Sequence, residues 1–174
     1  DGVFDAGWDV MRKERLERTI DLGLVPETTT LAPVHEDHRA WNDLSPEEKA
    51  QAARAMQVHA GMIEAADFHI ARLLDHLDAA GQLDDTIVVF TSDNGAEPGV
   101  TSLENPVFDL LLRGIHRVEK FDTSPDNMGL PGSLTAIGPE WASVEVAPFN
   151  LYKFYSSEGR SEEHTSELQS HAPI

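Results

Sequence analysis

An acid and an amide, Asp93 and Asn94, follow directly after the apolar run of residues 86–91 in the sequence TIVVFTSDNG. A carboxylate and a side-chain amide oxygen are ligands that Ca²⁺ and Mg²⁺ accept. Two adjacent donors supply too few ligands for either ion, so the other ligands must come from elsewhere. The Asn94-Gly95 dipeptide is also a common turn between two strands of a β-hairpin. Spacing alone leaves both the metal site and the turn open.

Histidines supply the other candidate ligands, but their surroundings favour ordinary roles. Residues 35–38, with the sequence HEDH, lie in a segment rich in proline and threonine, which predicts a solvated loop. His59, His69 and His76 fall within one predicted helix, without acidic or thiol partners at ligand spacing. They are therefore predicted to be exposed or core histidines. The chain has no cysteine, which excludes a disulfide or a thiol nucleophile within residues 1–174.

Length and charge narrow the classes of function. A chain of 174 residues suits one domain, and its first residue, Asp1, indicates a processed product or a fragment. The net charge of −18 disfavours nucleic acid or an anionic membrane surface as a partner, and it fits either a solvated acidic surface or cation binding. No apolar run approaches the roughly 20 residues of a membrane span, and no signal peptide begins the sequence. Localisation stays open.

Two helices are predicted before the apolar run. Residues 8–22 alternate charged and apolar side chains up to Gly23, which predicts an exposed amphipathic helix. A longer helix begins after Ser45, where Pro46 and Glu48 complete a capping box, and it ends at Gly81. Apolar side chains at spacings of three and four along this helix predict one buried stripe, made of Met56, Ile63, Ala66, Ile70, Leu73, Leu74 and Leu77.

The run of residues 86–91 is continuously apolar and rich in β-branched side chains, as is typical of a strand covered on both faces in a parallel sheet. A long helix that leads into such a strand is half of a βαβ unit. Ligands of these sheets gather beyond the carboxyl ends of the strands, which is where Asp93 and Asn94 lie. Residues 98–148 are predicted to be loop-rich, with one short helix at residues 106–115.

Two stretches of the chain resemble the type I sulfatases of the alkaline phosphatase superfamily. The first, MIEAADFHIARLLDHLDAAGQLDDTIVVFTSDNG, combines a long helix, a short linker and a strand-end motif in the order that this family has them. The second, GPEWASVEVAPFNLYKFYSSEG, is similar to a later block of the same family. The resemblance implies an α/β fold, with a mixed, largely parallel sheet flanked by helices and only part of it present here.

The resemblance also assigns individual residues. Asp93 and Asn94 look like two of the protein ligands of a catalytic Ca²⁺, and Lys153 looks like the lysine that contacts the sulfate group. Sulfatases attack sulfur with a formylglycine, which is made from the first residue of a Cys/Ser-x-Pro-x-Arg motif. No such motif occurs here, since SPEEK and TSPDN have proline at the wrong spacing and lack the arginine. The nucleophile is therefore expected to be absent from this chain.

The implied function is the hydrolysis of sulfate esters, carried on small molecules or glycans, by a longer enzyme of which this chain alone is inactive. Two alternatives stay open: a phosphonate or phosphodiester hydrolase of the same superfamily, and a non-enzymatic cation-binding module in which Asp93 and Asn94 form only a turn. We expect residues 1–159 to be a partial sulfatase catalytic domain. Residues 160–174 resemble the in-frame translation of a sequencing-library adapter and are expected to be non-biological.

Overall fold

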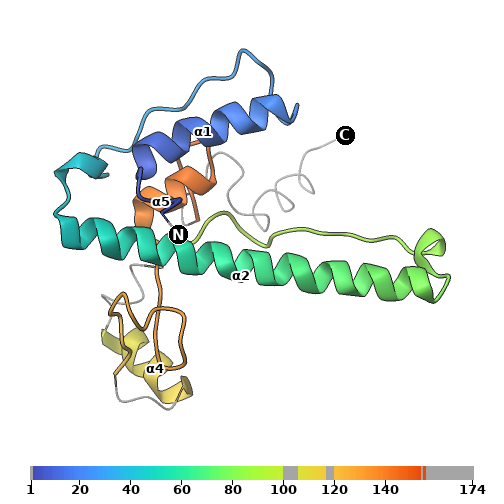
Figure 1. Ribbon diagram of the computed structural model, residues 1–174. Coiled ribbons are helices and arrows are strands. Elements are labelled where there is room, and N and C mark those ends of the chain that lie inside the picture. The colour runs from blue at the N-terminus through green and yellow to red at the C-terminus, as the bar shows by residue number, and fades with distance from the viewer. Residues whose placement is uncertain (1, 100–105, 117–119, 154, 156–174) are drawn as a thin grey trace, which may run out of the picture.

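The computed structural model describes residues 2–99, 106–116, 120–153 and 155. The longest helix is α2 (Pro46–Ala79). Helices α1 (Trp8–Asp21) and α5 (Gly138–Glu145) contact each other and lie along the N-terminal half of α2 (Figure 1). Helix α4 (Pro106–His116) lies on the other side of α2, and two short 3-10 turns, η1 (Trp41–Asp43) and η2 (Leu83–Asp85), flank α2 at its ends. The predicted boundary after residue 159 lies outside the described residues.

Local signals in the sequence account for both long helices. The Ser45 hydroxyl accepts a hydrogen bond from the Glu48 backbone N–H at 3.2 Å, and the Glu48 carboxylate accepts one from the Ser45 N–H at 2.8 Å. This is the predicted capping box, in which two helix-end N–H groups are satisfied reciprocally. Gly23 and Gly81 follow α1 and α2 with φ of 69° and 66°, the left-handed conformation that ends many helices.

Three tryptophans from distant parts of the chain make the core. The ring centroid of Trp41 lies 4.7 Å from that of Trp8 and 5.9 Å from that of Trp141, and Trp141 is fully buried. The indole N–H of Trp141 donates to the Ala52 carbonyl of α2 at 3.1 Å, and that of Trp8 donates to the Arg39 carbonyl at 2.9 Å. Each buried indole therefore has the hydrogen-bond partner that its polar edge requires.

Contacts in the core explain two features that were not predicted: a glycine before α1 and the helix α5. Gly7 precedes α1 with φ of 80°, and a Cβ there would lie 2.2 Å from the Trp41 ring, so no larger residue fits. Helix α5 falls inside the stretch that was predicted to be loop-rich. Pro139 in its first turn is a local helix-start signal, but the burial of Trp141 in the core is a long-range contact that the local sequence does not show.

The predicted stripe along α2 is only partly correct. Met56 is buried, and Ile70, Leu74 and Leu77 are half-buried. The other three residues of the predicted stripe, Ile63, Ala66 and Leu73, are exposed. Among the described helices, only the 3-10 turn η2 makes extensive contact with the C-terminal part of α2, where these residues lie. The apolar side chains are placed as a buried face requires, but the described residues cover only part of that face.

The predicted sheet does not form within the described residues, and the strand expected at residues 86–91 runs beside α2 as an unpaired segment (Figure 1). Ile87 and Phe90 are 91% and 83% exposed. A strand needs a neighbouring strand to satisfy its backbone N–H and C=O groups, and the described part of the chain offers this run none. A parallel bridge between Asp122 and Ser133 occurs elsewhere, isolated from any strand.

The remaining helix was predicted closely, with α4 covering Pro106–His116 where residues 106–115 were expected. Among the described helices, none is both long enough and apolar enough to cross a membrane.

Candidate functional site

Lys153 lies beside the segment that follows Asn94. Its backbone N–H donates to the Ala96 carbonyl at 3.0 Å, and its Nζ lies 2.7 Å from Oε2 of Glu97. Both side chains of this ion pair are partly exposed, so solvent reaches the ammonium. The fold thus brings the sequence-predicted lysine to the same loop as the sequence-predicted acid and amide.

Asp93 lies in a bend and Asn94 in an isolated β-bridge, so the pair does not form a hairpin between two described strands. The Ser92 hydroxyl donates to the Asn94 backbone carbonyl at 2.7 Å, which fixes the turn locally. Asp93 is exposed and Asn94 is half-buried. Within the described part of the chain the exposed Asp93 carboxylate has no hydrogen bond or ion pair, so no described residue blocks a ligand from solvent there.

A divalent cation would find only part of a coordination shell here. Asp93 and Asn94 provide hard oxygen donors of the kind that Ca²⁺ prefers, whereas Ca²⁺ takes six to eight of them. No group of three or more His, Asp or Glu side chains converges at ligand distance within the described residues. The donor types fit Ca²⁺, and these two side chains would fill only part of its coordination shell.

The segment that carries Lys153 is tied to the N-terminal part of the chain. The Arg12 guanidinium of α1 donates from Nη2 to the Phe149 carbonyl at 2.9 Å, and the Ala32 N–H donates to the Pro148 carbonyl at 2.9 Å. Arg12 is 6% exposed, and burial lowers the pKa of its guanidinium. A buried arginine that donates a hydrogen bond to a backbone carbonyl holds the two segments together and has a structural role.

The loop of residues 35–38 also contacts this segment, and the prediction that it is a solvated loop is wrong for His38. The half-buried His38 ring stacks on Tyr152, with ring centroids 5.9 Å apart and planes 16° from parallel. His38 Nε2 and Tyr152 Oη are 3.4 Å apart, within hydrogen-bonding distance. The solvated prediction holds for Asp37, which is exposed and reaches only the neighbouring His35 at 3.4 Å. Proline-rich composition indicated a connection, but it carried no information about this contact.

Burial shifts the pKa of both members of the stacked pair. It lowers the pKa of His38, an effect that Glu140 and Asp37 oppose, and it raises the pKa of Tyr152 well above that of free tyrosine. His38 is therefore held neutral, and Tyr152 keeps its hydroxyl proton.

The histidines of α2 have different roles. His59 Nε2 lies 2.7 Å from Oε1 of Glu145 in α5, and this hydrogen bond raises the pKa of His59. It is neither a metal ligand nor a plain core residue, since it joins two helices. His69 and His76 are exposed, as one of the two predicted roles requires.

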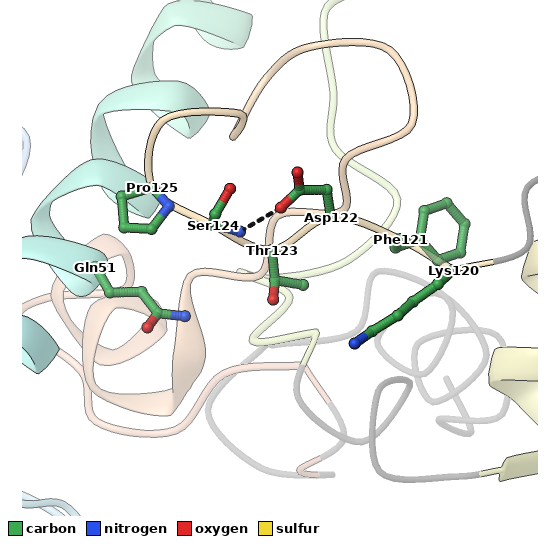
Figure 2. Close-up of a pocket in the computed structure, with 7 residues that line it drawn as sticks. All are labelled: Gln51, Lys120, Phe121, Asp122, Thr123, Ser124 and Pro125. Atoms are coloured by element: carbon green, nitrogen blue, oxygen red, sulfur yellow. Dashed lines mark hydrogen bonds between the residues drawn. The ribbon is translucent and has the colours of Figure 1, made fainter.

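A polar cavity of about 560 Å³ is lined by none of these residues but by Gln51, Lys120, Phe121, Asp122, Thr123, Ser124 and Pro125 (Figure 2). The Asp122 carboxylate accepts the Ser124 backbone N–H at 2.8 Å and a side-chain N–H of Asn127. Hydrogen bonding to the Ser124 side chain first, then to the Ser124 backbone N–H and to Asn127, lowers the pKa of Asp122. Its carboxylate is occupied in closing a local turn, so the cavity does not extend the candidate site.

Comparison with known proteins decides the family. The family model described as Sulfatase matches residues 20–129, a span that includes Asp93 and Asn94 and ends before Lys153. The chain belongs to the sulfatase family. The resemblance found in the sequence motifs is thereby confirmed.

Two relatives of this sulfatase chain are considerably longer than it is. It is 42% identical over 159 residues to an uncharacterised sulfatase of Schizosaccharomyces pombe, covering 91% of this chain and 28% of the relative. It is 34% identical over 161 residues to an arylsulfatase of Klebsiella aerogenes, covering 91% of this chain and 32% of the relative. The sulfatase chain thus spans less than a third of the length of either relative.

Proposed function

We propose that this chain forms part of a sulfatase that hydrolyses sulfate esters of small molecules or glycans. The observation that carries the proposal is the position of Lys153 against Ala96 and Glu97, on the loop that presents Asp93 and Asn94. A cation-binding pair beside a solvent-reachable ammonium is suited to an anionic group such as sulfate. The arylsulfatase relative supports the same class of substrate.

Asp93 and Asn94 would hold Ca²⁺ together with ligands from the rest of a longer polypeptide. When bound, the ion would supply Lewis acidity toward a sulfate oxygen. Asp93 is the stronger of the two ligands because its carboxylate is charged and, among the described residues, has no other bond. Asn94 contributes a neutral oxygen and is fixed by the turn that Ser92 closes.

Lys153 would bind the sulfate oxygens directly. Its ammonium is a compact charge with three N–H donors, and it lies 2.7 Å from Oε2 of Glu97. The ion pair with Glu97 holds the lysine side chain at the loop. When a substrate binds, the Lys153 ammonium would contact both the Glu97 carboxylate and the sulfate. The lysine then opposes the negative charge that develops on the ester as its bond to sulfur breaks.

The nucleophile would be a formylglycine from a Cys/Ser-x-Pro-x-Arg motif, which residues 1–174 do not contain. We therefore expect this chain by itself to turn over no sulfate ester. We also expect residues 86–91 to pair with strands of an α/β sheet in a longer sulfatase polypeptide, which would place Asp93 and Asn94 at the carboxyl edge of that sheet.

Kinetics of a longer sulfatase polypeptide that contains this segment tests the proposal. Lys153→Ala and Asp93→Ala should each lower kcat/KM for an aryl sulfate by about 10²-fold or more, as expected for groups that stabilise developing charge. His76→Gln, an exposed change on α2, serves as the matched control. Preference for an aryl phosphonate or a phosphodiester over the sulfate would overturn the substrate class. Unchanged kinetics in Lys153→Ala would overturn the role of the lysine.

A further inference from the structure

We propose that His38 is a positioning residue for Lys153, that it acts through Tyr152, and that protonation of His38 loosens the segment carrying the lysine. The proposal concerns how the chain is held, and only its consequence for sulfate binding rests on the proposed function. His38 lies in the N-terminal connection and is far in sequence from the residues it would control.

Tyr152 directly precedes Lys153, so the position of its ring sets the course of the backbone at the lysine. The ring is 7% exposed and is held on two sides. His38 stacks on one face at 5.9 Å, and Tyr155 meets it edge-on with ring centroids 5.3 Å apart. The Tyr155 N–H closes the turn by donating to the Tyr152 carbonyl at 3.3 Å.

The lysine segment therefore lies between two supports. On one side, the Lys153 N–H bonds to the Ala96 carbonyl and the ammonium pairs with Glu97. On the other side, His38 holds Tyr152, and Arg12 holds the Phe149 carbonyl. The Arg12 bond does not depend on pH in the neutral range, whereas the His38 contact does.

The protonation state of His38 determines whether its contact with Tyr152 is maintained. His38 Nε2 lies 3.4 Å from Tyr152 Oη, and the tautomer of the neutral ring decides which of the two donates. Protonation makes both ring nitrogens donors, so the pair can no longer exchange roles, and it places a positive charge in a half-buried site. The groups that act on this charge are Glu140 and Asp37, which favour it, and His35 and Arg12, which oppose it together with burial. The balance favours the neutral ring, so acidification strains the stacked pair.

Amide hydrogen exchange of this chain, measured by NMR and corrected for the intrinsic pH dependence, tests the proposal. In the unsubstituted chain, exchange of the Lys153 amide should quicken about tenfold as pH falls from about 7.5 to about 5.5, because its hydrogen bond to Ala96 opens more often. In His38→Ala, exchange should be fast at both pH values. The amide of Met56, in the core of α2, should not change.

The conservative variant separates positioning from general stability. His38→Gln can still accept the Tyr152 O–H but does not titrate, so it should restore slow exchange at Lys153 and remove the pH dependence. Retained pH dependence in His38→Gln, or slow exchange in His38→Ala, would overturn the proposal. If His38→Ala fails to fold, His38→Gln and Tyr152→Phe decide. Tyr152→Phe keeps the ring and loses the hydroxyl, and it should abolish the pH response.

A sulfate titration of the same samples keeps the two hypotheses apart. Sulfate-dependent shifts at the Lys153 side chain report on the proposed function, and the exchange rates report on positioning. Pronounced His38 dependence without any sulfate response would contradict the sulfate role of Lys153 and leave the positioning role supported.

Discussion

The ammonium of Lys153 lies 2.7 Å from the carboxylate of Glu97, three residues beyond Asn94. This ion pair joins a late segment of the chain to the loop that carries the candidate metal ligands. Lys153 is also anchored through its backbone, so the pair fixes the direction of the side chain more than the position of the residue.

Replacing Glu97 should change how strongly Lys153 binds an anion. Glu97→Gln removes the competing carboxylate, and we expect inorganic sulfate to bind about two- to fivefold more tightly, which is the range for a partly exposed pair. The side-chain nitrogen shift of Lys153 during a sulfate titration measures this. Glu64→Gln, on an exposed stretch of α2, is the control for the loss of one negative charge. Weaker binding in Glu97→Gln would instead assign Glu97 a supporting role in the anion site.

Calcium should act on the turn of Asp93 and Asn94 without stabilising the rest of the chain. Because only two donors are present, we expect weak binding, on the order of millimolar, seen as amide shifts confined to the turn. Asp93→Asn should abolish those shifts and leave the melting temperature unchanged, since the Asp93 side chain is exposed. Equal shifts at Asp122 would mean that calcium binds acidic residues without selectivity.

The exposed run of residues 86–91 should be nearly indifferent to substitution in this chain. Phe90→Ser should change the free energy of unfolding by about 0.5 kcal/mol or less, because the ring is 83% exposed. Trp141→Ala, in the core, should cost about 3–5 kcal/mol. Denaturant unfolding measures both.

The same Phe90→Ser change tests the proposed sheet when it is made in a longer sulfatase polypeptide. A residue covered on both faces of a sheet should then cost several kcal/mol, comparable with other buried aromatics. A small cost in the longer polypeptide would contradict the assignment of this run to a buried strand.

The ion pair of His59 with Glu145 should give a pH dependence opposite in sign to that of His38. The pKa of His59 is raised in the folded chain, so its stabilising effect is complete below the unfolded value of about 6.5 and is lost as pH rises through the folded value. The pKa of His38 is lowered, so its neutral form favours folding at high pH, and stability falls as pH drops below about 6.5.

Single variants are needed to see either effect, because the two oppose each other in the unsubstituted chain. His59→Gln should remove the loss of stability toward high pH, and Glu145→Gln should do the same with no further change in the double variant. The free energy of unfolding between about pH 5 and pH 8 measures this. Additive effects of the two substitutions would contradict a direct pair.

The sequence by itself determined the features that depend on neighbouring residues. The capping box of Ser45 and Glu48 and the left-handed glycines after α1 and α2 involve residues within a few positions of each other, so their types and spacing suffice. The motifs around Asp93 and Asn94 also identified the family correctly, because they occur as contiguous stretches.

Tertiary structure decided what depends on residues far apart in the chain. It placed Lys153 beside Glu97, turned His38 onto Tyr152, and created α5 by burying Trp141. It also left residues 86–91 without a strand partner among the described residues, although their pattern is that of a buried strand. A local pattern indicates which side chains of a segment need to be buried. Only other parts of the fold can supply the residues that cover them.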